Sequence, residues 1–123
     1  MIFPRAAGLS PYMQLRTYLN FPGNCREAFD YYEQHLGAKT LLMMTHPGHE
    51  GVMHGRLDLG GTILMASDVP HAEPMRSAYL TLLAPDTPEA ERLFAALADG
   101  GQVLMKLEET FFAHRFGEVR DRF

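Results

Sequence analysis

Two polar side chains with chemical potential, His54 and Arg56, stand two residues apart in a segment of alternating polar and apolar character, residues 52–59. Alternation of this kind is typical of a strand with one buried face. We therefore expect Met53 and Leu57 to pack toward the helices, with the two polar side chains on the opposite face. A neutral histidine whose pKa lies near physiological pH can accept or deliver a proton. His54 is therefore a candidate general acid or base; the alternative is a histidine that is hydrogen-bonded within the sheet or at a dimer interface.

A second candidate for proton transfer is Glu109, within Glu108-Glu109-Thr110. Adjacent side chains of a strand point to opposite faces, so the two carboxylates cannot act as an acid and base pair with each other. One of them could pair with His54 or Arg56 across a cleft and form a proton relay. The alternative is a turn in which both carboxylates are solvated.

Other chemical motifs are weak or lacking in the sequence. His46 and His49 have a spacing that a loop chelate could use, but no further ligands stand nearby, so we interpret this segment as a polar surface loop. The sequence contains no glycine-rich phosphate loop, no paired-cysteine metal knuckle and no Gly-x-Ser-x-Gly nucleophile elbow.

The first half of the chain has the pattern strand, helix and three strands. Asn24 followed by Glu27 has the form of a capping box, Gly37 is a helix stop, and Gly60-Gly61 indicates a hairpin. Leu15, as part of the apolar phase of the first strand, is expected to face inward. The predicted elements are a strand over 14–21, a helix over 25–36, and strands over 39–45, 52–59 and 62–67.

The second half repeats this order but ends sooner. After a connection over 68–76, a strand is predicted over 78–84, then a helix with Thr87 as N-cap and Pro88 in its first turn, then strand-like segments over 102–107 and 111–123. The helix should bury an apolar stripe of Ala90, Leu93, Phe94, Leu97 and Ala98. We predict an α+β fold of two βαβββ modules, 13–67 and 77–123, in which the second lacks its last strand. That strand belongs either to a longer protein or to a partner chain.

Size and composition limit the possible functions. A chain of 123 residues fits one domain, which we place at 13–123 after an N-terminal tail over 1–12. The net charge of −4 gives no basic stripe for nucleic acid, and no stretch approaches the roughly 18 apolar residues of a membrane helix. The single cysteine, Cys25, cannot form an internal disulfide. We therefore expect a cytoplasmic protein that binds neither nucleic acid nor membrane.

Several segments together resemble the PhnB-like branch of the vicinal oxygen chelate superfamily, which includes glyoxalase I, bleomycin-resistance proteins and extradiol dioxygenases. They are Tyr18-Leu19-Asn20-Phe21-Pro22-Gly23-Asn24, Met53-His54-Gly55-Arg56-Leu57, Leu64-Met65-Ala66-Ser67-Asp68, Glu109-Thr110-Phe111-Phe112-Ala113, Phe116-Gly117 and Asp121-Arg122-Phe123. The family usually carries tryptophan at the position of Phe112 and continues past Phe123 with a final strand.

The resemblance implies a glyoxalase-like arrangement, in which two modules form a curled mixed sheet around a cleft, usually within a homodimer. Asp68 could face this cleft or anchor the connection between modules, and the aromatic side chains could line it or belong to the core. The expected pocket residues are Tyr18, His54, Arg56, Asp68, Tyr79, Glu109, Thr110, Phe112 and Phe116.

The superfamily's enzymes generally hold a divalent metal through His, Glu or Gln side chains of inward-facing strand positions. Here the corresponding segments, residues 16–18, 64–66 and 77–79, offer no convincing ligand set, so we predict neither a metal nor another cofactor. Members of this branch are often labelled demethylubiquinone methyltransferases, but nothing here resembles the glycine-rich turn that cradles a methyl donor.

Three functions follow as hypotheses. In the first, the cleft binds a small, partly apolar molecule without a catalytic metal. In the second, the chain is a metal-dependent enzyme of the glyoxalase or dioxygenase type, with a site around His54 and Glu109. In the third, it is a dimeric interaction module whose sheet edge is completed by another chain.

Overall fold

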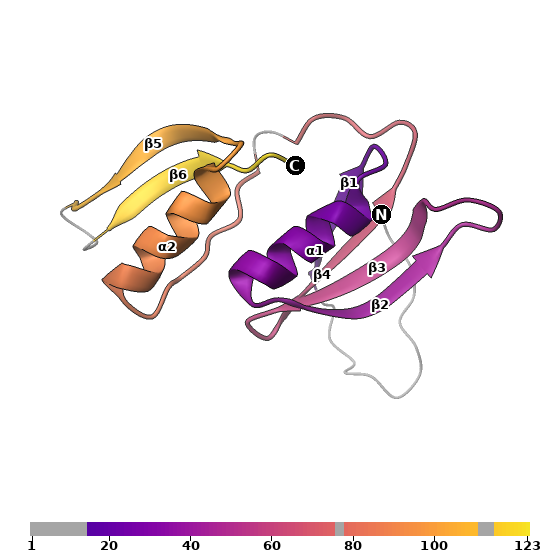
Figure 1. The fold of residues 1–123 in the computed structure, drawn as a ribbon, viewed down its shortest axis with the longest axis horizontal. Helices are drawn as coiled ribbons and strands as arrows, with labels where there is room; N and C mark the ends of the chain where they lie inside the picture. The colour runs from indigo at the N-terminus through magenta and orange to yellow at the C-terminus, as the bar shows by residue number, and fades with distance from the viewer. Residues whose placement is uncertain (1–14, 76–77, 111–114) are drawn as a thin grey trace.

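The structure, a computed structural model, describes residues 15–75, 78–110 and 115–123 and shows two sheets, each with its own helix (Figure 1). The strands form a four-stranded sheet of order β1-β4-β3-β2 and a two-stranded sheet of β5 and β6. This mixed α+β fold with unclosed sheets confirms the predicted fold class. Its elements are β1 (Thr17–Phe21), α1 (Cys25–Leu36), β2 (Lys39–Thr45), β3 (Val52–Leu59), β4 (Thr62–Asp68), α2 (Thr87–Ala98), β5 (Gln102–Glu108) and β6 (Phe116–Arg120).

The four-stranded sheet contains one parallel pair. β1 runs parallel to β4, and β3 is antiparallel to both of its neighbours, β4 and β2. A parallel pair requires a crossover connection, which α1, β2 and β3 supply between β1 and β4. β3 and β4 are joined by the predicted hairpin, in which Gly60 and Gly61 adopt φ values of 62° and 88°. Glycine adopts this backbone conformation at little cost, so the pair favours the tight turn.

The core lies between α1 and this sheet. Phe21, Phe29 and Leu57 are fully buried, and α1 contacts β2, β3 and β4. The ring of Phe29 rests on Gly55 of β3, where a Cβ atom would stand 3.0 Å from Phe29 Cε2. Gly37 ends the helix in the left-handed conformation, as predicted. The missing side chain at Gly55 therefore lets the helix approach the sheet closely.

The start of α1 is capped from a distant strand, so the predicted capping box is wrong. The Asn24 side chain makes no capping bond. Instead Asp68, at the end of β4, accepts from the backbone nitrogen of Cys25 (3.0 Å) and from that of Val52 (2.9 Å). A carboxylate at a helix N-terminus is favourable because it meets unpaired amides and the positive end of the helix dipole. Asp68 thereby joins α1 and β3 to β4, which extends one residue beyond the predicted strand.

Two side chains expected to face inward are exposed. β1 begins only at Thr17, and Leu15 is fully exposed. Met53 is 41% exposed because the pairing of β2 with β3 shifts register at this end, so that Thr45 pairs with Val52. Val52 is fully buried in place of Met53. A register irregularity exchanges the faces of neighbouring strand residues.

The second half departs further from its prediction. Residues 78–84 form no strand, and Tyr79 and Leu83 are 62% and 92% exposed. A strand needs a hydrogen-bonded neighbour, and among the described residues β6 pairs only with β5. The observed order of the second half is therefore αββ rather than βαββ. The apolar stripe of α2 is only half-buried, since two strands rather than four lie beneath it.

The packing of α2 nevertheless repeats that of α1. Asp86, rather than the predicted Thr87, caps the helix by accepting from the backbone nitrogen of Glu89 (2.9 Å). The ring of Phe94 lies against Gly117 of β6, where a Cβ atom would stand 2.9 Å from Phe94 Cε2. This contact matches the one between Phe29 and Gly55, so the duplication expected from the sequence is present in the packing.

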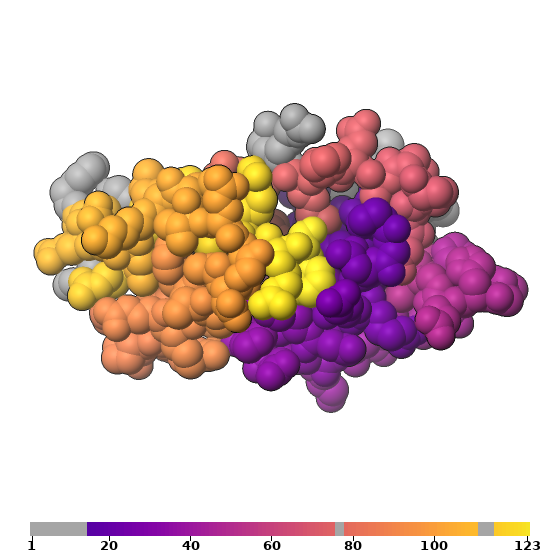
Figure 2. Space-filling model, turned by 45° about the horizontal axis from the view of Figure 1, so that its top comes forward, coloured from indigo at the N-terminus to yellow at the C-terminus, as the bar shows by residue number. Residues whose placement is uncertain are grey.

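The C-terminal residues join the two halves. Figure 2 shows them, in yellow, against the indigo segment that contains α1. The Tyr32 hydroxyl donates to Asp121 Oδ2 (2.6 Å), and the ring of Phe123 lies 5.3 Å from that of Tyr31. The Tyr31 hydroxyl donates to the Ala96 carbonyl of α2. The halves thus meet at α1.

Neither helix in the described parts of the chain is long and apolar enough to cross a membrane. Each has 12 residues, against the roughly 20 that a bilayer requires.

Candidate functional site

Three of the predicted pocket residues come together on the face of the four-stranded sheet that lies away from α1. Leu57 faces the helix, so its neighbours in alternation, His54 and Arg56, project from the other face of β3. Tyr18 projects from the same face of β1 and reaches His54. Met65 of β4 lies between the strands, since its Cα pairs with both Tyr18 and Arg56. We call this group, Tyr18, His54 and Arg56, the open-face triad.

Both ring nitrogens of His54 are hydrogen-bonded. Arg56 Nε donates to His54 Nε2 (3.3 Å), and the Tyr18 hydroxyl lies 3.2 Å from His54 Nδ1. A guanidinium group can only donate, so Nε2 must carry the lone pair and Nδ1 the hydrogen. Nδ1 therefore donates to the Tyr18 oxygen. The phenol hydrogen is left for another acceptor, which no described residue provides.

The environment keeps His54 neutral. Partial burial first, and the positive charge of Arg56 second, lower the pKa of His54 below its ordinary value of 6.5. A neutral ring is also what the geometry requires, because a protonated Nε2 could not accept from Arg56. Charge and geometry thus favour the same protonation state.

The other predicted pocket residues lie elsewhere. Glu109 is exposed and follows β5, which ends at the side of the second half farthest from β3 (Figure 1), so the relay with His54 is not formed. Thr110 comes next and is half-buried, and Phe116 is half-buried in β6. Tyr79 is exposed, and Phe112 lies outside the described residues.

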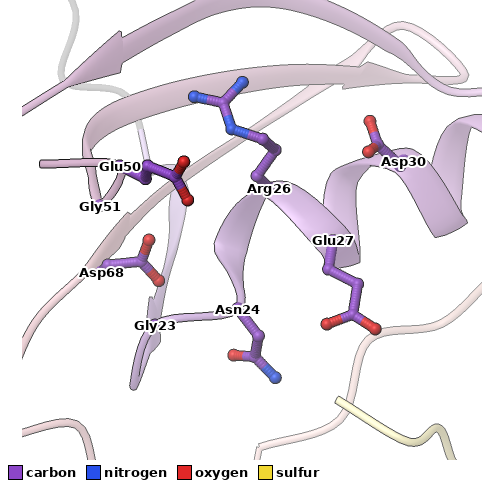
Figure 3. A pocket seen from close by; sticks show the side chains of 8 residues that line it. All are labelled: Gly23, Asn24, Arg26, Glu27, Asp30, Glu50, Gly51 and Asp68. Carbon is purple, nitrogen blue, oxygen red and sulfur yellow. The ribbon is translucent and has the colours of Figure 1, made fainter.

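Asp68 belongs to a different surface. It lines an open hollow of about 320 Å³ at the start of α1, together with Arg26, Glu27, Asp30 and Glu50 (Figure 3). In that view Glu50 and Asp68 point toward the beginning of the helix. Both oxygens of Asp68 accept hydrogen bonds from backbone amides, those of Cys25 and Val52. The carboxylate therefore anchors α1 and β3 to the end of β4. The triad does not line this hollow.

Cys25 is buried under the same anchor. Burial, reinforced by the Asp68 carboxylate and opposed by Arg26, raises the pKa of its thiol to about 12. The thiolate is the reactive form of cysteine, so Cys25 is unsuited to nucleophilic catalysis at neutral pH.

The described residues do not fit a divalent metal. They contain no group of three or more His, Cys, Asp or Glu side chains placed to share one ion. Both nitrogens of His54 are occupied, one of them by a cationic group. The rings of His46 and His49 are stacked, with centroids 4.8 Å apart and 23° between their planes, rather than aimed at a common point.

Met65 belongs to the same surface but was not among the pocket residues predicted from the sequence. Only 8% exposed, it lies in a run of four buried residues, Leu64 to Ser67. A continuous apolar run indicates a strand buried on both faces, and this signal could have placed Met65 beside the triad.

The comparisons with known proteins agree with the fold. The family model described as Glyoxalase/Bleomycin resistance protein/Dioxygenase superfamily matches residues 15–123. Protein YjdN from Escherichia coli (strain K12) is 32% identical in an alignment 132 positions long, which covers 90% of this chain and 90% of that one.

Two solved structures are also similar. Protein PA1353 from Pseudomonas aeruginosa is 43% identical, with a TM-score of 0.81 over 91% of this chain and 92% of that one. The PhnB protein from Bacillus cereus is 22% identical, with a TM-score of 0.77 over 89% and 92%, and shares the fold. With the family model and YjdN, these matches confirm the resemblance seen in the sequence. The chain therefore belongs to the glyoxalase/bleomycin resistance protein/dioxygenase superfamily.

Proposed function

We propose that this chain binds a small, partly apolar molecule over the open-face triad, without a catalytic metal. The observation that carries the proposal is the hydrogen-bonded arrangement of Tyr18, His54 and Arg56, which leaves the phenol hydrogen directed at no described acceptor. Ligand sites commonly combine a few fixed polar groups with apolar walls.

The neighbouring strands supply the apolar part of this surface. Met44 and Leu42 of β2 pair with His54 and Arg56 and so lie on the same face, and Met65 lies on the other side. Methionine side chains adapt to ligands of irregular shape because they are unbranched and polarisable. A ligand with one polar end and an apolar body would match this distribution.

Binding is tested by adding small, partly apolar compounds to ¹⁵N-labelled protein and following its amide and imidazole resonances. We expect ligands to shift the resonances of β1 and β3. Arg56→Met should weaken ligand binding and so reduce these shifts. Arg26→Met, which alters an exposed arginine at the hollow instead, is the matched control and should leave binding unchanged. The proposal would be contradicted if the compounds shifted only resonances of residues outside β1 and β3.

The enzyme hypothesis is less well supported, because Glu109 lies apart from His54. It is tested by elemental analysis of protein purified without chelators or an affinity tag. We expect no stoichiometric zinc, nickel, iron or manganese. One metal ion per chain would favour the metal-dependent enzyme over the proposed function.

We also propose that the chain forms a homodimer, through the second half. The apolar side chains exposed there are Tyr79, Leu80, Leu82, Leu83, Val103, Leu104 and Met105. Exposed apolar clusters often mark interfaces. Size-exclusion chromatography with light scattering should give twice the chain mass, and Val103→Lys should reduce the measured mass. A monomeric wild type would refute the homodimer.

A cytoplasmic location, expected from the single cysteine, belongs to the same proposal.

A further inference from the structure

We infer that the open-face triad binds a carboxylate or a similar oxyanion of its ligand. In this arrangement His54 is a positioning residue that holds Tyr18 and Arg56, the two groups that donate to the oxyanion. The inference rests on the proposed function and specifies its ligand class. It follows from the direction of each hydrogen bond in the triad.

The triad presents hydrogen-bond donors only. His54 uses its lone pair to accept from Arg56 Nε and its hydrogen to donate to the Tyr18 oxygen. Arg56 keeps its two terminal nitrogens, which no described residue engages, and Tyr18 keeps its hydroxyl hydrogen. A ligand therefore has to bring acceptors.

The charge of the surface points to an anion. Arg56 is exposed and cationic, and none of the described carboxylates forms an ion pair with it. The groups that face His54 are Tyr18 from β1, Arg56 from β3 and the uncharged Met44 from β2. With a neutral imidazole, the triad carries one positive charge. A guanidinium edge with two free nitrogens matches a carboxylate, and charge-assisted bonds of this kind are about twice as strong as neutral ones.

His54 determines where both donors lie. Its ring connects Tyr18 on β1 to Arg56 on β3, across the intervening strand β4. Without the ring, each long side chain would have to be ordered when the ligand binds, and the loss of its conformational freedom would weaken binding. His54 thus acts through Tyr18 and Arg56 rather than on the ligand.

The test compares three probes that share one aromatic ring: benzoate, benzyl alcohol and benzylamine. Binding of each to ¹⁵N-labelled protein is measured from the resonances of β1, β3 and the His54 imidazole. We expect benzoate to bind about tenfold more tightly than benzyl alcohol, and benzylamine to bind least, because hydrogen bonds to a charged acceptor are stronger than those to a neutral one. Arg56→Met should remove the preference for benzoate, while Arg26→Met should preserve it.

The positioning role has its own readout. The imidazole ¹⁵N shifts of the wild type should show hydrogen on Nδ1, and Arg56→Met should move it toward Nε2. His54→Gln, whose amide can both accept and donate, should retain more benzoate affinity than His54→Leu, which can do neither.

Each outcome decides a different point. Tighter binding of benzyl alcohol or benzylamine at β1 and β3 would overturn the inference while the proposed function stands. If none of the three probes moves these resonances, both fail. An Nε2–H tautomer in the wild type, or equal affinities of His54→Gln and His54→Leu, would overturn the positioning role.

Discussion

The two halves of the molecule use the same contact between helix and sheet but bury very different amounts of it. In each half a phenylalanine of the helix rests on a glycine of a strand: Phe29 on Gly55 in the first half, Phe94 on Gly117 in the second. α1 packs on the four-stranded sheet and its contact is fully buried, whereas α2 packs on a sheet that has two strands among the described residues, and none of the α2 residues is buried. The local pattern therefore fixes the geometry of the contact, and the number of strands decides how far it is buried.

The largest expected effect comes from removing the aromatic ring of each contact. Phe29→Ala should lower the free energy of unfolding by about 3–5 kcal/mol, because it leaves a cavity in a closed core. Phe94→Ala should cost about 1–2 kcal/mol, since the ring is only half-buried. Urea denaturation of both variants measures the difference. Equal losses would mean that the second half is as well covered in solution as the first.

The two helix caps provide the next comparison. Asp68→Ala should lower the free energy of unfolding by about 2–3 kcal/mol, because the amides of Cys25 and Val52 both lose a charged acceptor. Asp86→Ala removes one exposed bond at the start of α2 and should cost about 1 kcal/mol. Urea midpoints of the two variants give the ranking, and a larger loss for Asp86→Ala would contradict the view that Asp68 links three elements.

These caps also show where sequence patterns stop being informative. Alternation in β3 predicts that His54 and Arg56 lie on the face opposite Leu57, and the structure places them there, because the side-chain period of a strand is local. The cap at Asp68 was missed because it depends on β4 lying between β1 and β3, and this order is set by the whole sheet.

The second half illustrates the same limit. The apolar run over residues 78–84 has the composition of a strand, but composition does not show whether a neighbouring strand is available to pair with it. The distance of Glu109 from His54 likewise depends on how the two sheets lie relative to each other (Figure 1). The faces of His54, Arg56 and Leu57 could be read from the sequence, whereas the register shift that exposes Met53 and the contacts between sheets could not.

Replacing the two glycines by alanine should affect the halves differently: one substitution should lower global stability, and the other should open the second half locally. At Gly55 an added methyl meets the ring of Phe29 inside the closed core, so Gly55→Ala should cost about 1–2 kcal/mol of global stability. At Gly117 it meets the backbone of Leu107 at 2.9 Å, so β5 and β6 must move apart. We expect Gly117→Ala to speed amide hydrogen exchange in β5 and β6 while β1 to β4 stay protected. Faster exchange throughout both sheets would contradict independent opening of the second half.

The smallest expected effect is the dependence of stability on the protonation of His54, a contribution confined to the first half. The folded protein lowers the pKa of this ring below 6.5, through burial and then Arg56, so the unfolded chain takes up a proton first as the pH falls. The state that binds more protons is favoured at low pH, so the free energy of unfolding should decrease below about pH 6.5 and be unaffected by His54 above it.

His54→Gln removes this titration. Between about pH 7.5 and about pH 5.5 the urea midpoint of the wild type should therefore fall more than that of the variant. A difference that does not change with pH would mean that His54 is no less easily protonated in the folded protein than in the unfolded chain. The bond from Arg56 would then give the neutral ring no preference in the folded protein.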